Sequence, residues 1–525
     1  MAKGLFRSGM IVSAMTMISR VMGLVRDSVV ANILGAGAAA DVFLFANRIP
    51  NFLRRLFAEG AFAQAFVPVL AEIKEQHGDD KVRLFVAQAA GTLGTILMLV
   101  TLLGVIGSPI VAALFGTGWF IDWWQGGEDA YRFELASSLL KLTFPYLFFI
   151  SLVALSGAVL NVYNRFAAAA FTPVLLNISI ILCAIYLHDK FEVSAYALAL
   201  GVFIGGVVQF LFQLPFLAKL GMLKMPTFAW RSPEITKVRK LMIPALFGVS
   251  ISQINLLLDT VIASLLEKGS IAWLYYSDRL IEFPLGLFGI GIATVILPAL
   301  SKLHANAKLE DFQHTLDWGV RFVLLLGFPA MLGLSVISPL IITVLFDHGA
   351  FSATDVDNVR AVSLGVMAYS AGLVSFMLIK VLAPGFYSRQ DTKTPVKIGI
   401  KMLVLNMAFN LMLAPFIGYL GLALATSLSA TCNAWLLYRH LKKQNVYTLS
   451  NFSVWFTAKC VVASVVMAFV VLQVSQAFSW QTWALAEQVG FLCGVLMVAG
   501  VVYFSILFIL GIRLKTIKDV SNSTL

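Results

Sequence analysis

Residues 41–64 read DVFLFANRIPNFLRRLFAEGAFAQ, a stretch in which apolar, membrane-like sequence is repeatedly interrupted by charge. Its ionisable residues are Asp41, Arg48, Arg54, Arg55 and Glu59, and bends are expected at Pro50 and Gly60. An ionisable side chain at bilayer depth costs about 2.5 to 3.5 kcal/mol even on lenient insertion scales, unless it faces protein or water. The stretch therefore predicts a helix that lines a water-filled cavity within the membrane.

The composition of the whole chain predicts a membrane protein. Of its 525 residues, 59% are hydrophobic and 12% charged, and the mean hydropathy is +0.88, whereas soluble domains are roughly 45 to 50% apolar. A spanning helix needs about 20 mostly apolar residues, and the chain offers about fourteen such segments with little sequence left over. The predicted fold is an all-α polytopic membrane protein with about fourteen transmembrane helices.

Charge alternates between successive connections and predicts the orientation in the membrane. One set of connections is rich in Lys and Arg, among them residues 219–240 and 439–443, and the other set is poor, among them residues 122–129 and 347–358. Basic connections remain in the cytoplasm, so both termini are expected there. The net charge of +11 is then explained by basic residues that face anionic lipid headgroups, and no nucleic-acid partner is expected.

Motifs for catalysis, nucleotide binding or a structural metal are missing from the sequence. The four cysteines lie in apolar runs without ligand spacing, and no GxxxxGK[ST], HExxH or GxSxG occurs. We therefore expect a protein that is not an enzyme and has no cofactor, with the exception of a sodium ion considered below.

An internal repeat divides the chain. Setting Arg48 against Arg279 pairs several further residues at the same separation, namely Phe52 with Phe283, Leu56 with Leu287, Phe57 with Phe288 and Gly60 with Gly291. The motif Thr172-Pro173-Val174 likewise matches Thr394-Pro395-Val396. Because an even number of predicted spans separates the matched elements, the two halves share one orientation and form a parallel repeat.

The repeat predicts four parts. Two six-helix lobes cover residues 1–220 and 243–445, a cytoplasmic linker with Pro226 and Pro233 covers residues 221–242, and a two-helix hairpin outside the repeat covers residues 446–525.

Four long runs resemble the MurJ-type lipid II flippases of bacteria, and the resemblance extends over essentially the whole chain. They are SRVMGLVRD (19–27), NFLRRLFAEGAFAQAFVPVLAE (51–72), YYSDRLIEFPLGLFGIG (275–291) and APGFYSRQDTKTPVKI (383–398). The resemblance implies the multidrug/oligosaccharidyl-lipid/polysaccharide exporter superfamily, fourteen helices and two lobes across a central cavity. It also implies that the hairpin at 446–525 forms a groove for the polyprenyl tail of lipid II.

The same resemblance implies a function and partners. The substrate would be lipid II, an undecaprenyl-diphosphate-linked disaccharide peptide of peptidoglycan biosynthesis, flipped across the bacterial inner (cytoplasmic) membrane by alternating access. Membrane lipids and cell-wall synthesis proteins are the other expected partners. Two alternatives remain at this point: an exporter of another polyprenyl-linked oligosaccharide or of drugs, and a non-transporting membrane enzyme or scaffold of cell-wall assembly.

By resemblance, the substrate-binding residues are Arg20, Arg26, Arg54, Arg279 and Glu282. Arginine suits a diphosphate because its planar guanidinium donates two parallel hydrogen bonds and stays charged when partly dehydrated. The residues considered as gate or ion-pair partners are Asp27, Asp41, Arg48, Arg55, Glu59 and Asp278. The alternative interpretation is that all these arginines and carboxylates form structural ion pairs.

Helical spacing and resemblance disagree about one arginine. On a straight helix Asp41, Arg48, Arg55 and Glu59 share a stripe, whereas Arg54 lies on another face. Pro50 can rotate the helix beyond it, so we predict that Arg54, not Arg55, faces the cavity. Two pairs follow from spacing alone, Arg279 with Glu282 and Asp317 with Arg321. In the helix of Arg279, Pro284 and Gly286 predict a break.

A second polar cluster gives a sodium hypothesis. Its residues are Asp259, Asn406, Asn410 and Thr426. Oxygen atoms with a single carboxylate suit a hard monovalent cation better than a transition metal. Hydrogen bonding between buried amides of neighbouring helices is the alternative.

Overall fold

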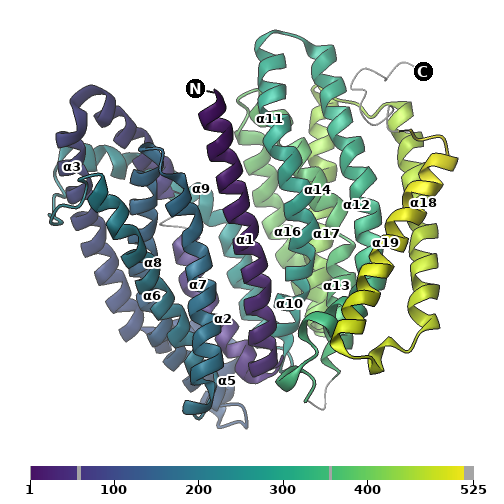
Figure 1. The fold of residues 1–525 in the computed structure, drawn as a ribbon, viewed down its shortest axis with the longest axis horizontal. Coiled ribbons are helices and arrows are strands. Elements are labelled where there is room, and N and C mark those ends of the chain that lie inside the picture. The colour runs from purple at the N-terminus through teal and green to yellow at the C-terminus, as the bar shows by residue number, and fades with distance from the viewer. Residues whose placement is uncertain (1, 56–60, 354–356, 514–525) are drawn as a thin grey trace. The chain divides into compact units, whose positions relative to one another are not determined.

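The computed structural model describes residues 2–55, 61–353 and 357–513, and all regular elements among them are helical (Figure 1). Eleven helices in this part of the chain are long and apolar enough to cross a membrane. The predicted class, an all-α polytopic membrane protein, is confirmed. The number of fourteen spans stays a prediction.

Contacts divide the chain into two compact units. The first unit comprises Met1–Ala272 and His348–Thr354, and the second comprises Trp273–Asp347 and Asp355–Leu525. The predicted division at residues 221–242 falls earlier in the chain than this one, because the helix that follows the linker packs on the first unit. The predicted lobes, linker and hairpin groove stay predictions.

The first unit is a bundle whose helices approach closely at small residues. A Cβ on Gly201 would lie 2.9 Å from the Cα of Ile180, and one on Gly206 would lie 2.9 Å from the ring of Tyr146. Such positions let backbones pack tightly where apolar side chains gain little over lipid. The helices are α1 (Ala2–Leu34), α2 (Ala38–Arg54), α3 (Ala61–Ile106), α4 (Ser108–Phe115), α5 (Thr117–Gln125), α6 (Tyr131–Val162), α7 (Phe166–Leu187), α8 (Ala195–Lys219) and α9 (Pro233–Ser264).

Helix α3 reverses direction at a single residue. Gly78 has φ 73° and ψ −176°, a region that is essentially restricted to glycine. The rings of Phe66 and Phe85, which flank this turn, stack with centroids 5.2 Å apart. Helical structure continues to this turn on both sides, because apolar residues pair across it.

The basic linker lies directly on α3. The amide of Thr227 donates to the carbonyl of Ala87 over 3.0 Å, and the amide of Ala229 donates to the hydroxyl of Thr92 over 3.0 Å. At the start of α9, a hydrogen bond from Ser232 holds the pKa of Glu234 below its ordinary value. The linker is therefore fixed to the first unit at several points.

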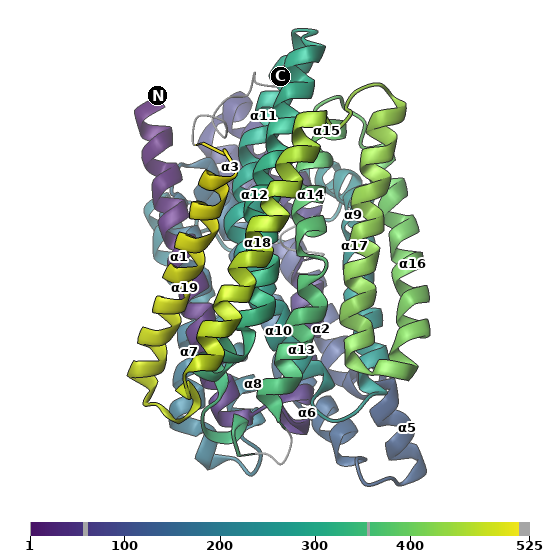
Figure 2. The same ribbon diagram turned by 90° about the vertical axis from the view of Figure 1, so that its right-hand side faces the viewer.

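The second unit contains the remaining long helices. Figure 2 shows α16 beside α17 and α18 beside α19. The elements are α10 (Ser270–Pro284), a π-helix (Leu285–Gly289), α11 (Ile290–Ala305), α12 (Leu309–Phe346), α13 (Asn358–Ser370), α14 (Leu373–Leu382), α15 (Pro384–Tyr387), α16 (Lys393–Ile417), α17 (Tyr419–Lys443), α18 (Asn451–Ala477) and α19 (Leu485–Ile509). The chain passes from the first unit to the second within α10.

Two membrane helices of the second unit are interrupted. The break predicted at Pro284 and Gly286 is confirmed as the π-helix between α10 and α11. The other break, between α13 and α14, was not predicted: the hydroxyl of Ser427 in α17 donates to the carbonyl of Ala368 over 2.7 Å. A Cβ on Gly372 would lie 2.7 Å from the Cα of Ser427, so glycine allows the approach that makes this bond possible.

A buried polar network joins α12 to the start of α18. Asp317 and Arg321 form the predicted pair, with Nε and Oδ2 3.4 Å apart and both side chains 5% exposed. Asp317 also accepts hydrogen bonds from the hydroxyls of Tyr447, Ser450 and Ser453 over 2.8, 3.2 and 2.6 Å. This carboxylate therefore attaches the C-terminal helix pair to the bundle.

Candidate functional site

Asp41, in the first turn of α2, is a buried acceptor for three donors. Its Oδ2 accepts from Arg132 Nη2 over 2.9 Å and from the amide of Gly269 over 2.7 Å, and its Oδ1 accepts from the amide of Ala272 over 2.8 Å. The carboxylate thus accepts hydrogen bonds from backbone amides at the beginning of α10, where a negative charge is favoured. All of these residues belong to the first unit.

Arg132, at the start of α6, is a residue that sequence reasoning missed. It is 4% exposed and lies over the ring of Trp119 at 4.9 Å. Lys268 pairs with the neighbouring Asp129 over 2.7 Å. One signal was present in the sequence. Arg132 closely follows the connection 122–129, which contains no Lys or Arg, and a basic residue next to such a connection is expected to pair with an acidic residue.

Arg48 binds a hydroxyl group. Its Nη1 donates to Thr260 Oγ1 of α9 over 2.8 Å, and Thr260 is fully buried. Asp41, which shares the predicted stripe of Arg48, is occupied by Arg132. For Asp41 the ion-pair alternative is realised, with Arg132 of α6 as the buried counter-charge.

Arg54 belongs to a polar ladder on α2. Its Nε donates to Asn51 Oδ1 over 3.2 Å, and Asn51 Nδ2 in turn donates to the carbonyl of Asn47 over 2.8 Å. Arg55 is exposed at the end of the helix. The choice between Arg54 and Arg55 as the cavity residue stays a prediction, and Glu59 lies outside the described residues.

The two arginines of α1 differ in their surroundings. Arg26 pairs with the buried Asp27 over 2.6 Å and donates from Nη1 to Asn177 Oδ1 of α7 over 3.1 Å. Arg20 is exposed and has no hydrogen bond or ion pair within residues 2–55 and 61–353. For Arg26 the ion-pair alternative is realised, while Arg20 presents an unneutralised guanidinium.

Arg279, in the second unit, stands directly before the π-helix. Its Nη1 is 2.9 Å from Glu282 Oε2, and its guanidinium lies over the ring of Tyr275 at 5.3 Å. The pair predicted from spacing is confirmed, so Glu282 serves as the partner of Arg279. Asp278, a carboxylate of the same helix that was considered as a gate or ion-pair partner, is exposed.

The residues of the sodium hypothesis lie in both units. Asn410 Nδ2 donates to Asn406 Oδ1 over 3.1 Å, and the hydroxyl of Thr426 donates to the carbonyl of Leu422 over 3.0 Å. Asp259 belongs to the first unit. Among the described residues no group of three or more His, Cys, Asp or Glu could hold a metal ion, and the oxygen set stays a prediction.

Positive charge exceeds negative charge on the described residues of α1 and α2. Asp41 is committed to Arg132 and to the start of α10, and Asp27 is committed to Arg26. Neither of these two carboxylates pairs with Arg20 or Arg48. Guanidinium groups on otherwise apolar helices are suited to an anionic ligand with several oxygen acceptors.

Comparison with known proteins adds an independent line of evidence. The family model described as lipid II flippase MurJ matches residues 30–490. A relative from Vibrio cholerae, named probable lipid II flippase MurJ, is 58% identical over 98% of both chains. Another from Burkholderia cenocepacia, named lipid II flippase MurJ, is 38% identical over 97% of this chain and 98% of its own.

Solved structures agree with this assignment. A lipid II flippase MurJ in an inward closed conformation matches with a TM-score of 0.78 and 25% identity, covering 95% of this chain and 98% of its own. An inward-facing multidrug transporter of the MATE family shares the fold, with a TM-score of 0.66 and 13% identity over 83% of this chain and 97% of its own. The arginine-rich helices, the family match and the relatives together establish that the chain belongs to the lipid II flippase MurJ family.

Proposed function

We propose that this protein moves lipid II from the cytoplasmic to the outer leaflet of the bacterial inner membrane, with arginines binding the diphosphate. No covalent bond is made or broken in this process, so the protein acts as a transporter and not as an enzyme. Both termini remain in the cytoplasm, and the two units alternate the side to which the substrate is accessible.

The observation that carries this proposal is the commitment of Asp41 to Arg132. A structural role for Arg48 requires a carboxylate to neutralise it, and Asp41 is the carboxylate that α2 offers within its described residues. Asp41 is occupied, and Arg48 donates to the hydroxyl of Thr260, a partner without charge. The positive charge of Arg48 is therefore available to a polyanionic cargo.

The known cost of leaving ionisable groups at bilayer depth supports the same function. An excess of guanidinium groups over carboxylates is stable there only when the guanidinium groups face water or a ligand. A diphosphate supplies both the charge and the geometry for bidentate hydrogen bonds. Export of cationic drugs would require an excess of acidic groups instead.

The test uses purified protein reconstituted into liposomes with labelled lipid II, and follows the fraction that reaches the outer leaflet. Arg54→Ala removes one charge-assisted hydrogen-bond donor, worth about 1.5 to 3 kcal/mol, and should lower flipping roughly 10- to 100-fold. Arg279→Ala should have a comparable effect. Arg83→Ala is the matched control, since it removes an exposed pair with Asp80 that contributes little.

The thermal unfolding of each variant in detergent shows whether it is folded. Folded Arg54→Ala and Arg279→Ala proteins that flip lipid II at the rate of the Arg83→Ala control would refute the proposal.

We further propose that sodium is the coupling ion and that Asp259 in the first unit and Asn406, Asn410 and Thr426 in the second unit each take part in the response to it. The support is chemical: these residues offer oxygen donors with one carboxylate, a set that suits a hard cation. Asp259→Asn should abolish the response of flipping to an imposed sodium gradient while the response to membrane potential persists. An unchanged response to the sodium gradient would contradict this assignment.

A further inference from the structure

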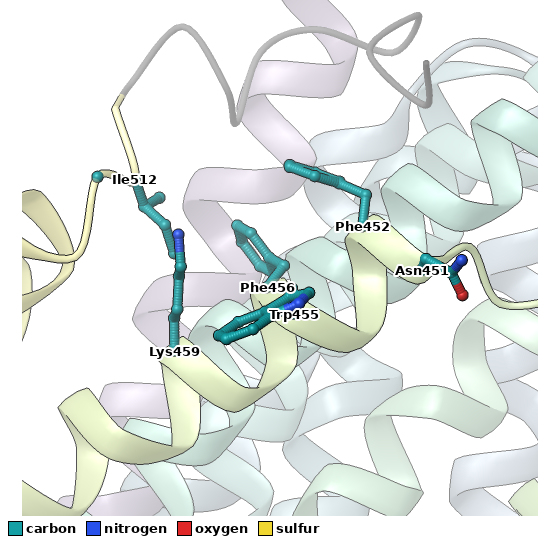
Figure 3. A pocket seen from close by; sticks show the side chains of 7 residues that line it. Asn451, Phe452, Trp455, Phe456, Lys459 and Ile512 are labelled. Carbon is teal, nitrogen blue, oxygen red and sulfur yellow. The ribbon is translucent and has the colours of Figure 1, made fainter. Parts of the chain in front are cut away.

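A cavity of about 280 Å³ lies where α18 begins and α19 ends, within the hairpin at 446–525 and apart from the arginines considered above. Its wall includes Asn451, Phe452, Trp455, Phe456, Lys459 and Ile512. In Figure 3 the side chain of Lys459 extends alongside Ile512, with the rings of Trp455 and Phe456 next to it. Pockets for drug-sized ligands measure roughly 300 to 1,000 Å³, so this volume suits a small headgroup.

Lys459 is the cation of this cavity. It lies about two turns into an apolar helix, is half-buried, and has no hydrogen bond or ion pair within the described part of the second unit. Side chains on a helix point toward its N-terminus, so the ammonium group is directed to the end of α18 where the cavity lies. A lysine so placed requires an anion or water as its partner.

A second cation stands behind the cavity wall. The guanidinium of Arg321 lies 5.2 Å from the centre of the Phe452 ring, on a residue that is 4% exposed. Its Nη2 atom finds no hydrogen-bond acceptor among the described residues. The carboxylate of Asp317 is shared between Arg321 and three hydroxyls, so part of the guanidinium keeps unused hydrogen-bond donors behind the wall.

An apolar stripe leads away from the cavity along α18. Trp455, Val462, Val466 and Phe469 follow one another at helical spacing on the side of Lys459, and all are exposed, Trp455 by 69% and Phe469 by 61%. Tryptophan is typical of the boundary between headgroups and hydrocarbon. A ligand with a charged head at Lys459 and an apolar chain on this stripe would match the surface over its whole length.

We propose that this cavity binds the headgroup phosphate of an anionic phospholipid, whose acyl chain lies along the stripe of α18. The phosphate pairs with Lys459, Asn451 donates from its side-chain amide, and Trp455 covers the glycerol backbone. This site is separate from the transport arginines, so the inference does not depend on the proposed function.

The test measures lipid binding to the full-length protein by native mass spectrometry in detergent. Phosphatidylglycerol and phosphatidylethanolamine with identical acyl chains serve as probes, and the first should bind more tightly because its net charge is negative. Lys459→Gln should weaken phosphatidylglycerol binding about fivefold, the effect of one basic residue at a membrane surface, and should abolish the preference between the two lipids.

Lys401→Gln is the matched control. Lys401 lies at the same depth in α16 as Lys459 in α18, and it is exposed. Trp455→Ala, a second variant, should weaken the binding of both lipids and keep the preference for phosphatidylglycerol. Thermal unfolding confirms that each variant is folded.

Several outcomes would overturn the proposal. Lys459→Gln could bind phosphatidylglycerol as the wild type does, or Lys401→Gln could weaken binding equally, which would indicate a general charge effect. Displacement of the lipid by an equal concentration of inorganic phosphate would assign the site to free phosphate. Displacement by a polyprenyl diphosphate at a lower concentration than phosphatidylglycerol requires would assign it to the transport substrate.

Discussion

Replacing Asp41 by asparagine keeps the shape of the side chain and removes its charge and one acceptor. Arg132 Nη2 and the amide of Gly269 share one carboxylate oxygen, and the amide of Ala272 uses the other. The less costly orientation of the new amide keeps the shared oxygen and turns its NH2 group toward Ala272. One buried N–H then loses its acceptor, which costs about 1 to 3 kcal/mol.

The charge of Arg132 adds to this cost. Arg132 is 4% exposed, and breaking a buried ion pair by removing one partner typically costs about 3 to 5 kcal/mol in total. We expect Asp41→Asn and Arg132→Gln each to destabilise the protein by that amount. The double variant should be destabilised by less than the sum, with a coupling of about 2 kcal/mol or more, because neither charge is then left alone.

A double-mutant cycle measured by unfolding in mixed micelles tests this reasoning. The wild type, the two single variants and the double variant are compared under one condition, and retained helicity by circular dichroism confirms the native state. Strictly additive effects of the two substitutions would show that Asp41 and Arg132 do not stabilise each other, and the role assigned to Asp41 would then fail.

Two further predictions concern the linker and the C-terminal helices. Gly91→Ala places a Cβ 2.3 Å from the carbonyl oxygen of Thr227, so the linker must move, and we expect proteolysis of the linker to become about tenfold faster. Gly94→Ala is the control, because its Cβ would meet its nearest atom at 4.0 Å and should leave the rate of proteolysis unchanged. Equal rates for the two variants would contradict the contact between α3 and the linker. Asp317→Ala leaves Arg321 without its buried counter-charge and should lower the free energy of unfolding by about 3 to 5 kcal/mol. The same unfolding assay measures this loss. A loss below about 1 kcal/mol would show that the network does not attach α18.

Pairs within one helix were predictable from the sequence. Arg279 with Glu282 and Asp317 with Arg321 are three and four residues apart, and helical geometry alone brings such residues together. The interruption at Pro284 was equally local, since proline removes a backbone hydrogen bond. The partner of Asp41 was not predictable, because Arg132 is 91 residues away and the arginines of α1 and α2 were competing candidates for the same carboxylate.

The turn at Gly78 and the break before α14 illustrate the same limit. A glycine inside an apolar pattern can mark a turn of the backbone or a close approach of another helix, or it can have no special role. Only the surrounding structure distinguishes these cases. At Gly78 the backbone conformation is decisive, since a Cβ there would meet no atom of the described residues within 4 Å beyond the adjacent chain. At Gly372 the decisive feature is the proximity of Ser427.

The stretch 41–64 separates what the sequence predicts from what depends on the tertiary structure. By itself the sequence determined that the chain spans a membrane and that its first helices carry more positive than negative charge, because these follow from composition. Only the tertiary structure decided that Asp41 holds Arg132 and the start of α10. That choice depends on which buried donors packing brings within hydrogen-bond distance, and the partner of Arg48 is accordingly an uncharged hydroxyl group.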